Sequence, residues 1–215
     1  MPIQLDASSQ PVHRRAARGV YKRFLALSFR VGKRTRSRVL NWFRPWAEWP
    51  GHDAHWDNLE AYAQWLPKHV RWKPDSLNGL IDVFPTRSTI AAQFKEKGIF
   101  EDDCDGLAYF SAQNLPLFVE DPAKIYIVTL ILDPYSFARD ALLYAAHVIT
   151  VFQHEGVWRV ISNATLYPDR YDSFARAVQD NPYTVSHPVL WAEVRDKDLN
   201  RIASDSDLGK LEAKL

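Results

Sequence analysis

The chain has few of the residues that build covalent or metal-bound frameworks. Its 215 residues include one cysteine, Cys104, and one methionine. A single thiol excludes an internal disulfide framework and a cysteine-rich zinc module. The longest aliphatic stretch, residues 125–132, already contains Tyr126 and Thr129, so no transmembrane helix is expected. The composition therefore predicts a water-soluble globular protein with one main core.

Acidic residues are almost missing from the first 44 positions. This segment holds one acid and eleven lysines and arginines, for a net charge of +10, whereas the remainder holds 16 bases and 25 acids, for −9. Bases interrupt its apolar residues, so it does not fit a secretory signal, although an organelle transit peptide stays an alternative. We expect a cytoplasmic protein with a basic, helical arm at 1–44 and a main domain at 45–215.

The arm has the pattern of a basic amphipathic helix. Val20, Phe24, Leu27 and Val31 recur at spacings of 4, 3 and 4, with bases around them. Three roles fit this pattern: binding to the phosphates of nucleic acid, binding to an anionic membrane surface, or packing on the acidic body or an acidic partner. The sequence leaves all three open, and it leaves the oligomeric state unknown.

The remaining residues predict helices followed by an antiparallel sheet, which is an α+β order. A short helix is expected between an N-cap at Asp53 and an end at Pro67. Further helices are expected at about 86–97, 104–114, 168–179 and 196–215, and strands at 124–132, 146–153, 157–162 and 189–194.

Three residues form a candidate catalytic site. Cys104 lies at the start of a predicted helix, where free N–H groups and the positive end of the helix dipole favour a thiolate. A hairpin with its loop at residues 154–156 pairs residue i with about 310 − i, which sets His147 opposite Asn163. The Asn163 side chain is then expected to orient the imidazole, whose other nitrogen faces the thiol.

Each of these residues also has a structural interpretation. A lone cysteine is commonly a small buried hydrophobe, a histidine at a strand start is commonly structural, and an asparagine after a strand is a common turn former. The three residues taken together, with His147 and Asn163 opposite each other in the expected hairpin, favour a catalytic site over three separate structural roles.

Four motifs between about residues 55 and 170 occur in a characteristic order. They are Val70-Arg71-Trp72-Lys73-Pro74-Asp75 followed by Gly79 and Asp82, Asp102-Asp103-Cys104-Asp105-Gly106-Leu107-Ala108, His147-Val148-Ile149-Thr150-Val151, and Trp158-Arg159-Val160-Ile161-Ser162-Asn163. Together they resemble the transglutaminase-like cysteine peptidases of bacteria and their phages, within the papain-like superfamily. Asp102 and Asn163 depart from this pattern, because the family has glycine and frequently aspartate there.

The resemblance implies both a fold and an activity. It implies a papain-like core, in which a helix bearing Cys104 packs on an antiparallel sheet. Cys104 would be the nucleophile, His147 the general base and acid, and Asn163 the orienting residue. The activity implied is hydrolysis of a peptide or amide bond in a protein or peptide substrate, through a thioester, with acyl transfer to an amine as a variant.

Other parts of the site are less specified. An oxyanion donor is required, for which the Cys104 N–H is one candidate and Gln93 is a second; solvation at the surface is the alternative for Gln93. His52 and His55 lack a third metal ligand at a known spacing, and no glycine-rich phosphate loop occurs, so no metal or cofactor is expected.

A hypothesis from a different class competes with the enzyme. A non-catalytic structural or binding module of the same fold, for example a phage virion component, would work through its basic arm.

Overall fold

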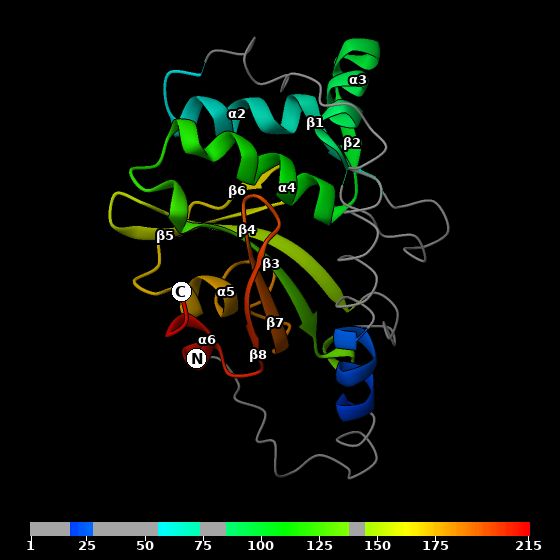
Figure 1. Cartoon of the computed structure of the whole chain (residues 1–215), viewed down its shortest axis with the longest axis vertical. Coiled ribbons are helices and arrows are strands. Elements are labelled where there is room, and N and C mark those ends of the chain that lie inside the picture. The colour runs from blue at the N-terminus through cyan, green and yellow to red at the C-terminus, as the bar shows by residue number, and fades with distance from the viewer. Residues whose placement is uncertain (1–17, 28–55, 74–84, 138–144) are drawn as a thin grey trace.

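A six-stranded antiparallel sheet with the strand order β6-β5-β4-β3-β7-β8 forms the centre of the protein. The computed structural model describes residues 18–27, 56–73, 85–137 and 145–215. Its mixture of helices and an antiparallel sheet agrees with the predicted α+β class (Figure 1). The strands are β3 (Ile125–Leu132), β4 (Ala146–His154), β5 (Val157–Ser162), β6 (Thr165–Leu166), β7 (Val189–Asp196) and β8 (Arg201–Asp205).

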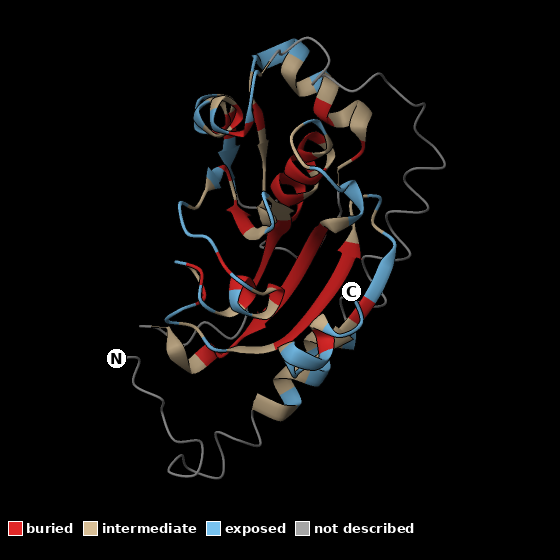
Figure 2. Cartoon of the chain, turned by 90° about the vertical axis from the view of Figure 1, so that its left-hand side faces the viewer, coloured by how far each residue is buried: buried red, intermediate tan, exposed pale blue. Residues whose placement is uncertain are grey.

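Helices cover both faces of this sheet (Figures 1 and 2). One layer contains α2 (Leu59–His69) and α4 (Cys104–Asn114), and the other contains α5 (Phe174–Gln179) and α6 (Leu208–Glu212). Beyond α4 lie α3 (Arg87–Lys97) and a parallel two-stranded sheet. Its strands are β1 (Val70–Trp72) and β2 (Phe100–Asp102), and single turns of 3-10 helix occur at η3 (Leu115–Leu117), η4 (Pro122–Lys124) and η5 (Pro134–Ser136).

Residues alternate between the two cores along each central strand. On β3, Ile125 and Ile127 belong to the core under α4, whereas Val128 and Leu130 belong to the core under α5. All eight residues of β3 are buried, because the strand has a layer of helices on each side.

An aromatic cluster fills the core between α4 and its neighbours. The Phe110 ring lies 5.7 Å from that of Phe94, 5.6 Å from that of Phe100 and 6.2 Å from that of Trp65, measured between centroids. Phe110 itself is 1% exposed. These contacts join α2, α3 and β2 to the helix that carries Cys104.

Several elements begin and end where the sequence predicted. Helix α3 has Thr86 as its N-cap and Gly98, at a φ of 69°, as its C-cap. Helix α4 starts at Cys104 after the N-cap Asp103 and ends at Asn114. Strands β3, β4 and β5 also match within one residue at each end. In each case the terminus is marked locally by a capping side chain, a glycine or a turn.

Three predicted helices have different bounds. Helix α2 begins after Asn58, which accepts a hydrogen bond from the N–H of Ala61 at 2.8 Å, and it continues past Pro67 to His69. The predicted N-cap Asp53 lies outside the described residues. Proline is tolerated here because it stands in the last turn, where the N–H of Val70 still bonds to the Leu66 carbonyl.

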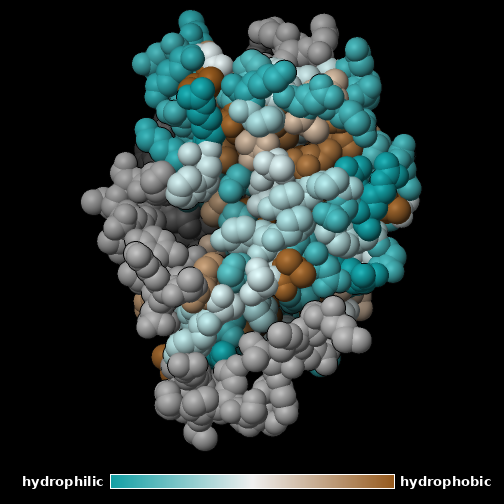
Figure 3. Space-filling model, turned by 180° about the vertical axis from the view of Figure 1, so that it is seen from behind, coloured by the Kyte–Doolittle hydropathy of each residue, from teal (hydrophilic) through white to brown (hydrophobic). Residues whose placement is uncertain are grey.

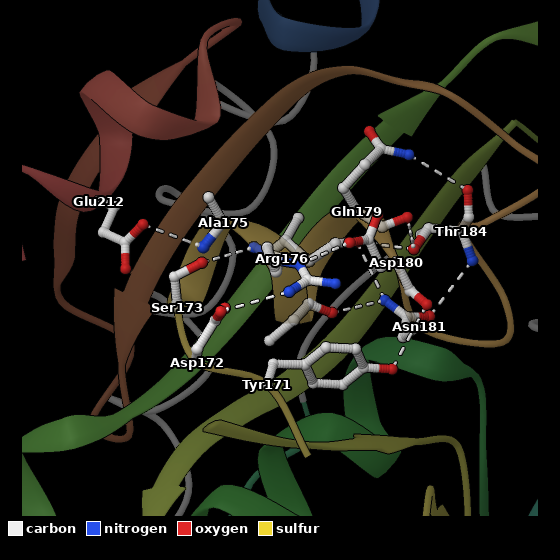
Figure 4. Close-up of polar contacts among 12 residues, drawn as sticks. Tyr171, Asp172, Ser173, Ala175, Arg176, Gln179, Asp180, Asn181, Thr184 and Glu212 are labelled. Carbon is white, nitrogen blue, oxygen red and sulfur yellow. Dashed lines mark hydrogen bonds and ion pairs between the residues drawn. The ribbon is translucent and has the colours of Figure 1, made fainter. Parts of the chain in front are cut away.

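The prediction of a helix from Pro168 is wrong. The backbone of Tyr171 forms two hydrogen bonds with that of Trp158, at 2.9 and 3.0 Å, so this segment extends along β5. Helix α5 begins only after Ser173, whose hydroxyl accepts from the N–H of Arg176 at 3.3 Å. Glu212 of α6 accepts from the N–H of Phe174 at 2.7 Å and from that of Ala175 at 3.3 Å, and these tertiary contacts complete the cap; Figure 4 shows the contact with Ala175.

The prediction of one polar helix over 196–215 is also wrong. The Asp196 carboxylate accepts from the N–H groups of Asp198 and Asn200, at 2.9 and 2.8 Å, and closes a turn. The chain then returns as β8 along β7, and only Leu208–Glu212 is helical, as α6. An aspartate that bonds to the backbone two and four residues later stabilises a turn at the expense of a helix.

The surface has the expected distribution of polarity. Seen from behind, it is mostly hydrophilic, with hydrophobic groups in small patches (Figure 3). Within the described residues, no helix combines the length and the apolar character that crossing a bilayer requires.

The aromatic cluster generates a stability prediction. Phe110→Ala is expected to lower the free energy of unfolding by about 3–5 kcal/mol, because it leaves a cavity among three aromatic rings. Leu117→Ala is the control, since Leu117 is 64% exposed, and it should change stability by less than about 0.5 kcal/mol. Urea unfolding measures both, and equal losses would contradict the assignment of Phe110 to the core.

Candidate active site

Cys104 is the first residue of α4 and is partly buried. The Asp103 side chain caps the helix by accepting from the N–H of Asp105 at 3.0 Å. Asp102 accepts from the N–H of Asp103 at 3.0 Å, and its carboxylate lies so close to Gly106 that a Cβ there would overlap it. The helix N-terminus favours a negative charge on the Cys104 thiol, whereas the neighbouring carboxyl groups of Asp102, Asp103 and Asp105 disfavour it.

His147 lies near the start of β4 and is 5% exposed. Its Nε2 atom is 2.8 Å from the hydroxyl oxygen of Ser162, at the end of β5. Burial lowers the pKa of His147 from its ordinary value of 6.5 to about 4. The imidazole is therefore neutral at pH 7.

Tyr183 packs on the histidine. Its ring lies against the His147 imidazole, with 4.0 Å between centroids and 31° between planes. Burial raises the pKa of the Tyr183 phenol, and the negative charge of Cys104 raises it further. Tyr183 thus contacts the imidazole and is affected by the charge of Cys104, while the hydrogen bond that the structure gives His147 goes to Ser162.

A turn held by the buried side chain of Asn181 positions Tyr183 (Figure 4). The Asn181 amide donates to the carbonyl oxygens of Ala177 and Val178, at 2.9 and 3.0 Å, at the end of α5. Its oxygen accepts from the N–H groups of Tyr183 and Thr184, at 3.1 and 3.2 Å. Tyr183 was not among the predicted site residues; the local signal in the sequence is Asn181-Pro182, a typical turn pair.

The predicted pairing of His147 with Asn163 is wrong by one residue. The β4–β5 ladder pairs Ile149 with Ser162, and its turn consists of Glu155 and Gly156, at φ values of 52° and 75°. His154, which we placed in the loop, belongs to β4. Residue i therefore pairs with 311 − i, which sets residue 164 in line with His147. The imidazole contacts Ser162, which pairs with Ile149, in place of Asn163.

Asn163 lies in the turn between β5 and β6 and has a left-handed backbone, with φ at 50°. Asparagine adopts this conformation more readily than most residues. Its Oδ1 atom is buried and has no hydrogen-bond partner among the residues that the structure describes. The turn role that we gave as the alternative therefore describes Asn163 well.

Gln93 has a structural contact. Its Oε1 atom accepts from the N–H of Glu101 at 3.0 Å, which ties α3 to β2 just before Cys104. The predicted role of Gln93 as an oxyanion donor stays a prediction. His52 and His55 lie outside the described residues.

Cys104 and His147 come from opposite layers. Val148 and Phe152 of β4 belong to the core under α4, and the Thr150 hydroxyl donates to the Ala108 carbonyl of α4 at 2.9 Å. His147 alternates with these residues and pairs with Leu130, which belongs to the other core. Cys104 packs against the core under α4. The two side chains therefore approach from different faces of the sheet.

The β4–β5 ladder stops short of His147. The β4–β5 ladder ends at Ile149 and Ser162, two residues before His147 is reached. The Cys104 end of α4 and the start of β4 lie toward the same side of the molecule (Figure 1).

Comparison with known proteins gives no further assignment. No family model matches the chain, and neither the curated proteins nor the solved structures include a significant match.

The low pKa of His147 predicts a pH-dependent stability. The histidine has a pKa of about 4 in the folded protein and about 6.5 when unfolded, so only the unfolded state binds the proton between these values. The free energy of unfolding should fall by about 3 kcal/mol as the pH drops from 7 to 4. Urea unfolding at several pH values should show a flatter dependence for His147→Gln.

An NMR titration of the His147 ring is the direct check. An imidazole that titrates near 6.5 in the folded protein would contradict its burial in a neutral form.

Proposed function

We propose that the protein is a cysteine-dependent hydrolase of a peptide or amide bond, with Cys104 as the nucleophile and His147 as the base. The observations that support this proposal are the contacts of His147 with Tyr183 and Ser162 near the start of β4, and the effect of the Cys104 charge on the pKa of the Tyr183 phenol. The site combines a thiol at a helix N-terminus with a neutral imidazole, one nitrogen of which is hydrogen-bonded to the hydroxyl of Ser162. A papain-like arrangement of helix and sheet is part of the same proposal.

The chemistry begins from a neutral pair. A His147 pKa of about 4 disfavours a standing thiolate–imidazolium pair at pH 7. The thiol proton would pass to the imidazole as the Cys104 sulfur bonds to the carbonyl carbon. The same proton would then pass to the leaving amine as the carbon–nitrogen bond breaks, which leaves a thioester. Water, deprotonated by His147, would hydrolyse the thioester and regenerate the thiol.

Ser162 replaces Asn163 as the orienting residue in this proposal. With Nε2 carrying the proton and donating to the Ser162 hydroxyl, Nδ1 keeps a free lone pair that can accept the proton from Cys104. Tyr183 packs on the ring and limits its rotation. In this proposal the Cys104 thiol and the His147 Nδ1 atom meet beyond the last β4–β5 pair, because the two side chains start from different faces of the sheet.

The same geometry supports a second candidate, a non-catalytic module. A buried histidine with a low pKa, a serine partner and an aromatic neighbour has the contacts of a structural residue. Its position on the face opposite α4 is the specific observation that favours this candidate.

Alkylation of Cys104 separates the two candidates. Iodoacetamide at pH 7 should modify the wild-type thiol at least about tenfold faster than it modifies the thiol of His147→Ala, because the imidazole would accept the thiol proton. Ser162→Ala should also slow the reaction. Asn163→Gly is the matched control, since glycine keeps the left-handed backbone and removes only the amide. Mass spectrometry of the modified peptide measures each rate.

Equal rates in the wild type and His147→Ala would show that the imidazole does not reach the thiol. That result would leave the non-catalytic module as the better account. A slow rate in Asn163→Gly with a normal rate in Ser162→Ala would restore the originally predicted orienting residue.

A further inference from the structure

Helix 18–27 has one face against the body of the protein. Arg18 forms two contacts with the Asp133 carboxylate, at 2.6 and 2.9 Å, and its guanidinium lies 5.2 Å from the centre of the Tyr135 ring. Lys22 donates to the hydroxyl of Ser206 at 3.1 Å. Tyr21 packs against the core under α5, and burial raises its pKa to about 12. These contacts agree with the predicted packing of the arm on the acidic body.

The opposite face of this helix is an apolar ridge. Val20, Phe24 and Leu27 are 70%, 67% and 62% exposed. Their spacing of four and three residues places them on one side of the helix, away from Arg18, Tyr21 and Lys22. The sequence pattern identified this apolar face correctly, but it is the polar face that packs on the body. The ridge is consequently left in contact with water.

The positive charge around the apolar ridge favours an anionic partner. Arg23 lies between two members of the ridge and is exposed. The flanking sequence adds arginines and lysines on both sides, and residues 1–44 carry eleven bases and one acid. An exposed apolar ridge among bases is the pattern of a helix that lies in the interface of an anionic bilayer.

Two other occupants fit less well. A second copy of this chain would bring two segments of charge +10 together, and they would repel each other. The phosphates of a nucleic acid would contact the lysines and arginines of the arm. The aliphatic side chains of Val20 and Leu27, however, offer a nucleic acid neither hydrogen bonds nor stacking.

We propose that helix 18–27 docks the protein on anionic membranes. Val20, Phe24 and Leu27 would enter the boundary between headgroups and acyl chains, while Arg23 contacts lipid phosphates and the net positive charge of residues 1–44 attracts the anionic surface. The helix lies at the margin of the molecule (Figure 1), so the body can remain in water while the ridge is buried. This proposal is independent of the activity proposed for Cys104.

Vesicle flotation of the full-length protein tests the proposal. The protein should float with vesicles of mixed phosphatidylglycerol and phosphatidylcholine, less at high salt, and remain unbound with phosphatidylcholine alone. The variant V20S/F24S/L27S should weaken binding at least about tenfold and keep the wild-type thermal melt, because the three side chains are exposed.

The matched control is L117S/V185S/I202S, which changes three other exposed apolar residues and should bind like the wild type. Failure of the wild type to float, or equal flotation of V20S/F24S/L27S, would overturn the proposal. Binding to duplex DNA without flotation would assign the arm to nucleic acid. A dimer that V20S/F24S/L27S converts to a monomer, again without flotation, would assign the ridge to a second copy.

Discussion

The arrangement of this protein depends on the burial of β3 along its whole length. A strand with eight buried residues requires an apolar layer on each side, since each face carries every second side chain. The layer with α2 and α4 covers one face, and the layer with α5 and α6 covers the other. Every residue of the neighbouring strands is then assigned to one layer or the other by its position in the register.

That assignment explains how far the candidate site could be predicted. The start of α4 at Cys104 is encoded locally, by Asp103 as a cap and by Gly106 beside Asp102. The face of the sheet from which His147 emerges is not encoded locally. Because β4 is apolar on both faces, either of its faces could pack against α4. The two-residue turn at Glu155 and Gly156 moves the register by one residue, so that His147 no longer faces Asn163 and contacts Ser162, the partner of Ile149, through its side chain.

The limits on predicting the fold have a similar origin. Helices α3 and α4 and strand β5 were placed correctly because their ends are capped or turned by residues close in sequence. Helix α5 was misplaced because its first turn is satisfied by Glu212, which lies 38 residues away. Tyr183 could not be recognised for the same reason, since its position depends on contacts of Asn181 with the end of α5.

The ion pair of Arg18 with Asp133 has a mechanical consequence. Asp133 directly follows β3 and also accepts from the N–H of Tyr135 at 3.0 Å, so it is rigidly held. The preceding residue, Leu132, bonds to the carbonyl of Ala145 at 2.7 Å, two residues before His147. The ion pair therefore attaches helix 18–27 to the end of the sheet that carries His147, through the residue that directly follows β3.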